Sequence, residues 1–248
     1  MTQSWDVPSG LVPVARAIFG ERLPVVEEFA SLLANEGTDW GLLGPREVPR
    51  LWDRHVLNCV CISEFVSSDG YVADLGSGAG LPGIPLGIAR EDVRVDLVEP
   101  MERRALFLDT CVERLGLKNV RVVRTSGEEF GARAAKSGEV PDYVTCRALS
   151  SLSSLLVMTA RLVPPGVLLA IKGAKAADEV SRARVGLRSR GLAASIRESF
   201  VSGFHLGSVV EVAAGSSSDE GRGERTHSSR YFWNSGGSEG TRSGSWVI

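Results

Sequence analysis

The sequence predicts an α/β fold in which a mostly parallel sheet carries helices on both faces, preceded by a helical N-terminal extension. From Tyr71 to about Val212, short β-rich runs alternate with helical stretches, which is typical of right-handed βαβ units. Glycines concentrate directly after the first β-rich run, where a parallel α/β sheet forms its ligand-binding crevice.

The first 68 residues carry the signals of helices. Two segments, 24–35 and 46–65, repeat apolar residues at helical spacing. These residues are Val25, Phe29, Leu32 and Leu33 in the first segment, and Leu51, Trp52, Val56 and Val60 in the second. We therefore expect residues 1–68 to form a helical extension that packs on a domain of residues 69–214.

Within this domain, most strand candidates are followed by a helical stretch. The strand candidates are YVADL, VRVDLVE, NVRVV, PDYVTC and GVLLAIK, and helices are expected at 82–90, 101–115, 150–162 and 176–191. The tail of residues 215–248 is too polar and glycine-rich to pack, so we expect it to be largely disordered. The role of its one aromatic segment, RYFWN, stays open.

Composition argues against several classes of protein. The chain has no run of 18 apolar residues that would support a transmembrane helix, and MTQSWDVPSG lacks the features of a secretory signal. The four cysteines form no CxxC pair and no zinc-ribbon spacing. We therefore expect a reduced, cytoplasmic protein with no metal site and no membrane association. With a formal net charge of −2, any RNA binding must depend on local basic patches.

The stretch YVADLGSGAGLPGIPL contains the predicted ligand loop. Gly76, Gly78 and Gly80 follow the strand on alternate residues, where glycine allows positive φ and a close approach of a ligand to the backbone. Pro82 suits the first turn of a helix whose free N–H groups point back toward the loop. A tight turn without a ligand is the alternative, although such connections are short and seldom need four glycines.

Two ligands fit this loop. Residues 78–83 formally match the GxGxxG dinucleotide fingerprint, but the first loop glycine is Gly76 and the helix restarts at Pro82, which is a different register. With Asp74, the loop instead resembles the Asp-x-Gly-x-Gly-x-Gly pattern of S-adenosylmethionine-dependent methyltransferases, in which the carboxylate lies near the cationic amino-acid end of the cofactor. Glu99 ends a strand about 20 residues downstream, where an acid accepts ribose hydroxyl hydrogen bonds from either ligand. A solvated carboxylate near a helix start is the other interpretation of Glu99.

The segment Ser126-Gly127-Glu128-Glu129 follows the third strand candidate. In such methyltransferases this loop lies against the adenine ring, and Gly127 and Glu128 are placed to meet its amino edge. Taken alone, SGEE predicts a helix start capped by Ser126, with Glu129 at the third position. The two interpretations are compatible.

Several motifs together point to one family. GSGAGLPGIPL, the preceding RLWDRHVLNC, and the later TCRALSSL and LLAIKG resemble the bacterial 16S rRNA guanine-527 N7 methyltransferases, also called glucose-inhibited division protein B. The resemblance covers about residues 15–210. It implies a Rossmann-like class I S-adenosylmethionine-dependent methyltransferase that methylates N7 of a single guanine in the 530 loop. It also implies cofactor contacts at Gly76, Leu81, Gly127, Glu128 and Arg147.

The chain departs from the family pattern at two places. The usual Ser-Arg-Ala reads Cys146-Arg147-Ala148 here, and Asn58 replaces the Asp of the usual Arg-His-x-Leu-Asp. Neither change removes a residue to which a role is assigned.

The implied reaction needs no general base, because N7 of guanine carries a lone pair and no proton. The enzyme must align the reactants and exclude water, and the positioning candidates are Arg147, His55 and Lys172. N7 must stay free, so we expect Arg147 to position the cofactor or a phosphate, or to contact O6 alone; an ion pair at the strand-to-helix turn is the alternative. His55 either lines the active-site mouth or packs within its helix. Lys172 either contacts phosphate or base or is solvated.

RNA contacts are expected from local basic residues, although a solvated helix face explains the same charges. The candidates are Arg103, Arg104, Lys172, Arg182, Arg184, Arg188 and Arg190. The expected partner is 16S rRNA, or a small-subunit ribosomal particle or precursor, presenting an unpaired loop guanine to a monomeric enzyme. Two alternatives stay open: a methyltransferase of this fold acting on another RNA or a small molecule, and a dinucleotide-binding oxidoreductase or regulatory protein.

Overall fold

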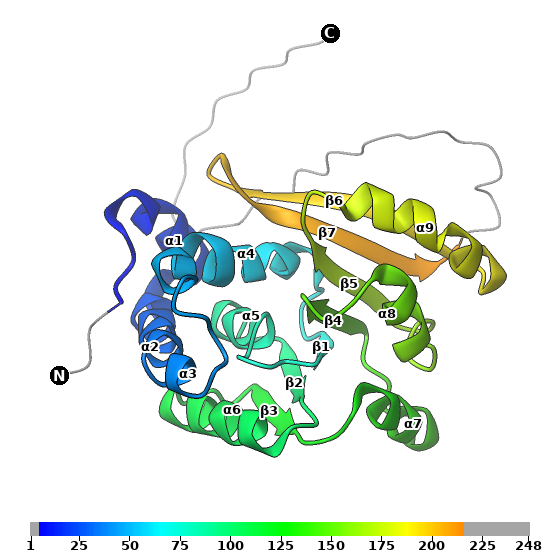
Figure 1. The fold of residues 1–248 in the computed structure, drawn as a ribbon, viewed down its shortest axis with the longest axis horizontal. Coiled ribbons are helices and arrows are strands. Elements are labelled where there is room, and N and C mark those ends of the chain that lie inside the picture. Colours follow the sequence, from blue (N-terminus) through cyan, green and yellow to red (C-terminus); the bar gives the residue numbers. More distant parts are fainter. Residues whose placement is uncertain (1–4, 216–248) are drawn as a thin grey trace, which may run out of the picture. The chain divides into compact units, whose positions relative to one another are not determined.

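The computed structural model describes residues 5–215, which contain a sheet of seven strands in the order β3-β2-β1-β4-β5-β7-β6 (Figure 1). Five strands are parallel: β1 (Tyr71–Leu75), β2 (Arg94–Val98), β3 (Val120–Val123), β4 (Tyr143–Arg147) and β5 (Val167–Lys172). The chain order reverses between β1 and β4, which is the topological switch point where such sheets bind ligands. The predicted α/β fold class is therefore confirmed, with all five strand candidates in place.

A C-terminal hairpin completes the sheet and was not predicted. Its strands are β6 (Leu192–Val201) and β7 (Phe204–Ala214), and β7 runs antiparallel to β5. The residues LAASIRESFV of β6 alternate only weakly between apolar and polar. A strand at the edge of a sheet needs less apolar alternation than a central one, so the periodicity gave no clear signal.

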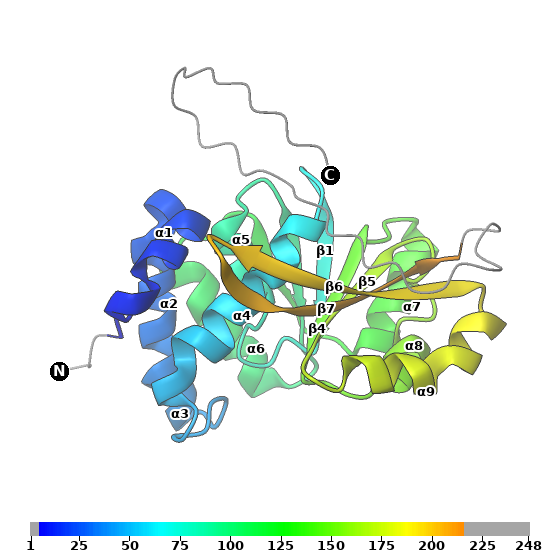
Figure 2. The same ribbon diagram turned by 90° about the horizontal axis from the view of Figure 1, so that it is seen from above.

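Helices cover both faces of the sheet (Figure 2). One face packs against α5 (Gly83–Ala89), α6 (Glu102–Arg114) and the N-terminal helices, and the other packs against α7 (Gly127–Ser137), α8 (Leu152–Met158) and α9 (Ala176–Ser189). Successive residues of β1 belong to the two separate cores, Val72 to the first and Ala73 to the second, because successive side chains of a strand point to opposite faces. The helix predicted at 150–162 is shorter than expected and ends at Met158.

The N-terminal segment is a series of short helical pieces. The α-helices are α1 (Val12–Phe19), α2 (Leu23–Ala34), α3 (Glu36–Asp39) and α4 (Leu57–Cys59). The 3₁₀ turns are η1 (Ser9–Leu11), η2 (Gly20–Arg22), η3 (Val48–Arg50) and η5 (Val60–Phe65), and η4 (Leu51–Val56) is a π-helical turn. The single helical stripe expected over 46–65 is thus broken into four pieces. Leu57, Val60, Cys61 and Ile62 are all fully buried, so packing on all sides, rather than one amphipathic face, decides the local geometry.

Across residues 5–215, no helix is both long and apolar enough to cross a membrane. The tail from residue 216 onward, including RYFWN, lies outside the described residues, and so does almost all of the segment for which disorder is predicted.

Asn119 joins three turns on the first face of the sheet. Its Nδ2 donates to the carbonyl oxygens of Gly87, Arg90 and Val93, each at 3.0 Å. These carbonyls belong to the end of α5 and to the loop that leads into β2. One amide therefore satisfies backbone acceptors that the helix terminus leaves without intrahelical donors.

Replacing Asn119 should destabilise the fold through these carbonyls. We expect Asn119→Ala to lower the free energy of unfolding by about 1–3 kcal/mol, because partly buried acceptors lose their donor. Asn119→Asp should cost more, since a carboxylate oxygen would then face the same carbonyl oxygens. Urea denaturation measures both values, and equal stability of the wild type and the two variants would contradict this role.

Candidate functional site

The glycine loop after β1 is held by the end of β2. The N–H groups of Gly76 and Ser77 donate to the carbonyl of Val98 at 2.8 and 3.2 Å. Glu99, which is 1% exposed, accepts from the Gly78 N–H at 2.9 Å with Oε2 and from the Met101 N–H at 3.0 Å with Oε1. This carboxylate therefore bridges the glycine loop and the start of α6. Each of its oxygens has a further lone pair that could accept a ribose hydroxyl.

Asp74 lies beneath the same loop and is fully buried. Its Oδ2 accepts from the Gly83 N–H in the first turn of α5 at 3.0 Å. Its Oδ1 is buried and has no hydrogen-bond partner among residues 5–215. Burial raises the pKa of Asp74 to about 7, and the Gly83 N–H opposes that rise. A buried acceptor without a partner is rare and costly, so Oδ1 marks a place where a cationic or N–H donor of a ligand would be satisfied.

The three alternating glycines serve different purposes. A Cβ on Gly76 would lie 2.7 Å from the end of the Leu149 side chain, and one on Gly80 would lie 2.4 Å from that of Ile84. Both glycines also have positive φ, so a side chain at either position would strain the backbone and displace a neighbour. At Gly78 the only atom within 4 Å of a Cβ is the Gly76 carbonyl oxygen, at 3.7 Å, although φ is +55°. The space above Gly78 is thus open and suits a ligand that approaches the backbone.

The other predicted cofactor contacts lie around this loop. Leu81 is 9% exposed and donates its N–H to the Ser77 carbonyl. Ser126 caps α7 by accepting from the Glu129 N–H, as predicted. Gly127 is the first residue of α7, and a Cβ on it would lie 3.5 Å from Leu75 at the end of β1. The next residue, Glu128, is exposed. The unpaired carboxylate oxygen and the open space at Gly78 therefore fit an S-adenosylmethionine site.

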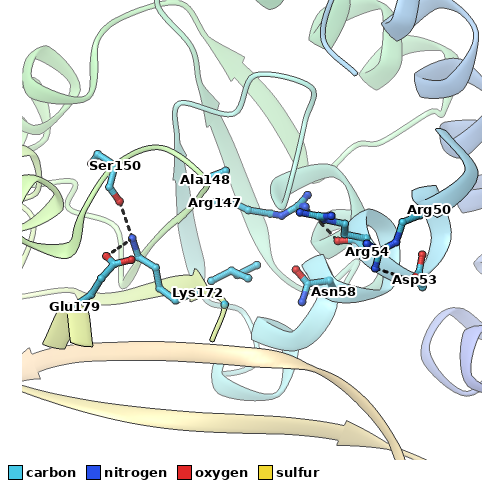
Figure 3. A pocket seen from close by; sticks show the side chains of 11 residues that line it. Arg50, Asp53, Arg54, Asn58, Arg147, Ala148, Ser150, Lys172 and Glu179 are labelled. Carbon is cyan, nitrogen blue, oxygen red and sulfur yellow. Dashed lines mark hydrogen bonds and ion pairs between the residues drawn. The ribbon is translucent and has the colours of Figure 1, made fainter. Parts of the chain in front are cut away.

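A pocket of about 480 Å³ opens over the ends of β4 and β5 (Figure 3). It is lined by Arg50, Asp53, Arg54, Asn58, Arg147, Ala148, Ser150, Ile171, Lys172, Gly173 and Glu179. Its volume is typical of small-molecule sites. Ala148 has φ +52°, a strained conformation for a non-glycine residue, and such strain clusters at functional sites.

Lys172 forms one wall of the pocket and is not solvated. Its Nζ lies 2.9 Å from Glu179 Oε2 and donates to the Ser150 carbonyl at 2.6 Å, with the side chain only 10% exposed. Glu179 Oε2 also accepts from the Leu152 N–H at 2.8 Å. The lysine thus joins β5 to the starts of α8 and α9, as the left side of Figure 3 shows.

Arg147 forms the opposite wall and is bound to the N-terminal segment. Its guanidinium donates to His55 Nδ1 at 2.8 Å, to the Arg54 carbonyl at 3.1 Å and to Cys59 Sγ at 3.5 Å. Because arginine only donates, Nδ1 must accept, and the His55 proton lies on Nε2, which donates to Glu47 Oε2 at 2.9 Å. Burial and the charge of Arg147 lower the pKa of His55, which keeps it neutral. His55, 8% exposed, is not among the residues that line the pocket.

The predicted RNA contacts are dispersed. Arg103, at the start of α6, is exposed and lies over the Trp40 ring at 5.5 Å, whereas Arg104 is half-buried. On α9, three exposed arginines follow one another along the helix: Arg182, Arg184 and Arg188. Arg190 donates to the carbonyls of Leu156, Ala160 and Val163 at the end of α8, so its donors stabilise the fold.

Sequence reasoning did not single out several residues of the pocket. Arg50 and Arg54 stand four residues apart within the quoted RLWDRHVLNC motif, and that spacing was a usable signal. Glu179 and Ser150 had no such signal, because only the tertiary fold brings them to Lys172.

Comparisons with known proteins agree with this geometry. The chain matches the family described as rRNA small subunit methyltransferase G over residues 22–205. It is 46% identical over 187 residues to the "Ribosomal RNA small subunit methyltransferase G" of Arthrobacter sp. (strain FB24), covering 75% of this chain and 84% of that protein. It is 48% identical over 188 residues to the protein of the same name from Rhodococcus jostii (strain RHA1), covering 75% and 80%.

Solved structures similar to the chain include a "SAM dependent methyltransferase from Aquifex aeolicus", with a TM-score of 0.48 and 21% identity, covering 69% of this chain and 100% of that one. Another is Aeropyrum pernix fibrillarin with natively bound S-adenosyl-L-methionine, with a TM-score of 0.45 and 18% identity, covering 60% and 67%.

The buried carboxylate should give the ligand-free protein a distinctive pH dependence. The pKa of Asp74 in the folded state, about 7, lies above the ordinary carboxyl value near 4. Between these values the folded state binds more protons than the unfolded state, so stability falls as pH rises from about 4 to 7. Asp74→Asn should reduce the loss of stability between pH 5 and pH 8, measured by urea unfolding. The exposed control Asp109→Asn should keep it, and an unchanged pH dependence in Asp74→Asn would exclude this assignment.

The contact chain through His55 should contribute measurable stability. His55→Phe leaves both Arg147 and Glu47 without their histidine partner, at an expected cost of about 1–3 kcal/mol. His205→Phe is the matched control, because His205 is 50% exposed and its contacts, an ion pair with Glu198 and a ring contact with Phe200, stay within the hairpin. A change within about 0.5 kcal/mol is expected there. Equal costs for the two variants, measured by denaturant unfolding, would count against the role of His55.

Proposed function

The chain belongs to the rRNA small subunit methyltransferase G family, and on that basis we propose that it transfers a methyl group to N7 of a single guanine, position 527 in the 530 loop of 16S rRNA. S-adenosylmethionine is the cofactor. Family membership confirms the resemblance that the motifs indicated and removes the dinucleotide-binding alternative.

One observation carries the proposal: the open glycine loop and the basic pocket share the crevice at the switch point of the sheet. The loop with Asp74 and Glu99 lies over β1 and β2, and the pocket lies over β4 and β5. A cofactor bound at the first would present its reactive end toward a nucleobase bound at the second. We assign Asp74, Gly78 and Glu99 to the cofactor, together with backbone groups near Leu81 and Gly127.

The chemistry requires positioning rather than proton transfer. When bound, S-adenosylmethionine supplies an activated methyl group and a neutral leaving group. N7 has a lone pair and no proton, so the protein's task is to hold the base in line and to exclude water. The pocket offers fixed walls for this task, Arg147 on one side and Lys172 on the other, each held by neighbouring carbonyl oxygens.

The substrate is a folded small-subunit particle or precursor rather than bare RNA in this proposal. The net charge of −2 provides no strong long-range attraction for RNA, so shape and local contacts must supply the specificity. We further propose that the enzyme acts as a monomer in the cytoplasm. Another RNA, or a small molecule, is the alternative substrate, and the pocket volume of about 480 Å³ alone does not separate these.

Methyl transfer from labelled S-adenosylmethionine to small-subunit particles that lack this modification tests the proposal. Reduction followed by aniline cleavage cuts RNA at N7-methylguanine, and we expect one strong cut in the 530 loop. Transfer only to another RNA, or at another atom, would refute it. Equal transfer to bare 16S rRNA would refute the preference for particles.

The matched loop variants are Gly78→Asp and Gly116→Asp. Both glycines have positive φ, +55° and +62°, and neither lies close to packed side chains, so the backbone strain is similar. Only Gly78 lies over the proposed cofactor site. We expect Gly78→Asp to weaken cofactor binding at least about tenfold, or 1.4 kcal/mol, and Gly116→Asp to retain it in calorimetry. Equal binding by both variants would contradict the cofactor assignment.

A further inference from the structure

The four cations that line the pocket over β4 and β5 differ in how their charges are used. Arg147 and Lys172 lie inside, where Lys172 is 10% exposed, and both are held by hydrogen bonds to protein groups. Arg50 and Arg54 lie on the N-terminal wall with side chains 54% and 52% exposed. Figure 3 shows this pair on the same side of the pocket as Arg147.

The contacts of the exposed pair are weak and exchangeable. Arg50 lies 3.4 Å from Asp53, and Arg54 lies 3.5 Å from Glu47. Glu47 is already the acceptor of His55 at 2.9 Å. Solvent-exposed ion pairs of this kind contribute little to stability, so both guanidinium groups can turn to a stronger acceptor without disturbing the fold. A phosphate oxygen is such an acceptor, and arginine binds it with paired N–H donors.

The backbone positions the two arginines together. They stand four residues apart across the junction of η3 and η4, and η4 is a π-helical turn, a feature frequent at functional sites. The Arg147 guanidinium donates to the Arg54 carbonyl at 3.1 Å, and thereby ties this turn to the end of β4. The side chains of Arg50 and Arg54 are therefore exposed and weakly paired, on a backbone that is held at the pocket.

The competing basic surface on α9 leads away from the pocket. Helix α9 begins shortly after the end of β5 and runs antiparallel to it. Its direction follows from Arg190, just past the end of α9, which donates to the carbonyl of Val163, just before the start of β5. Arg184 and Arg188 therefore lie progressively farther from Lys172. They are exposed and four residues apart. They therefore match Arg50 and Arg54 in charge and spacing, but they do not line the pocket.

From these observations we propose that Arg50 and Arg54 are the phosphate contacts of the target nucleotide, and that the RNA backbone reaches the pocket across η3 and η4 rather than along α9. This inference rests on the proposed function and specifies how the same site holds its RNA.

The test compares two double variants that remove the same charge at the same spacing, Arg50→Gln/Arg54→Gln and Arg184→Gln/Arg188→Gln. Binding to unmodified small-subunit particles is measured between 50 and 250 mM KCl. For the pair at the pocket we expect roughly tenfold weaker binding at 100 mM, and a salt dependence shallower by about 1.5 in the slope of log K against log salt. The α9 pair should bind as the wild type does.

Cofactor binding separates loss of RNA contact from loss of structure. Arg50→Gln/Arg54→Gln should bind S-adenosylmethionine as the wild type does in calorimetry, since neither side chain lies at the glycine loop. Wild-type binding and salt slope in this variant would overturn the inference, and so would equal losses in both double variants, because the effect would then follow net charge alone. If the wild type itself neither binds nor methylates the particle, the proposed function fails first, and this inference fails with it.

Discussion

The site depends on two buried carboxylates that hold the backbone of the glycine loop. Glu99 accepts from Gly78 and Met101, and Asp74 accepts from Gly83, so β1, β2 and the first turns of α5 and α6 are fixed relative to one another. A loop this rich in glycine has a large conformational entropy in the unfolded chain, and that entropy is lost when the loop is ordered. Backbone N–H groups that donate to carboxyl oxygens held rigidly by the sheet restrict the loop. What remains open is the space above Gly78, while the buried Oδ1 of Asp74 is left without a hydrogen-bond partner among the described residues.

The N-terminal segment completes the other half of the crevice through one guanidinium. Arg147 joins the end of β4 to His55, to the Arg54 carbonyl and to Cys59. Because the buried His55 is neutral, it can accept from Arg147 and donate to Glu47 at once. The result is a wall of the pocket built from residues about 90 apart in the chain. The segment is therefore part of the site, and its short irregular helices follow from the need to bury apolar residues while presenting polar ones to the pocket.

The sequence predicted those features that depend on local pattern. The five parallel strands, the glycine loop and the Ser126 cap follow from spacing along the chain, whereas the burial of Asp74 and Glu99 was not predicted. The β6–β7 hairpin was missed because an edge strand with weak alternation carries little periodic signal. The ion pair of Lys172 with Glu179, and the chain from Arg147 to Glu47, depend on contacts between distant segments. Only the fold shows that Arg50 and Arg54 line the pocket.

The distribution of charge across the pocket suits the reaction that we propose. A guanine methylated at N7 is cationic, so free cations beside the base would oppose its formation, while the phosphate of the same nucleotide needs cations. Inside the pocket, Lys172 is paired with Glu179, and the Arg147 guanidinium is directed to a carbonyl oxygen and a neutral imidazole. At the exposed wall, Arg50 and Arg54 are only weakly paired. Where the base would lie, the charge of Lys172 is thus compensated by Glu179 and the donors of Arg147 are taken up by protein groups. Where the backbone would pass, Arg50 and Arg54 are only weakly paired and can bind phosphate.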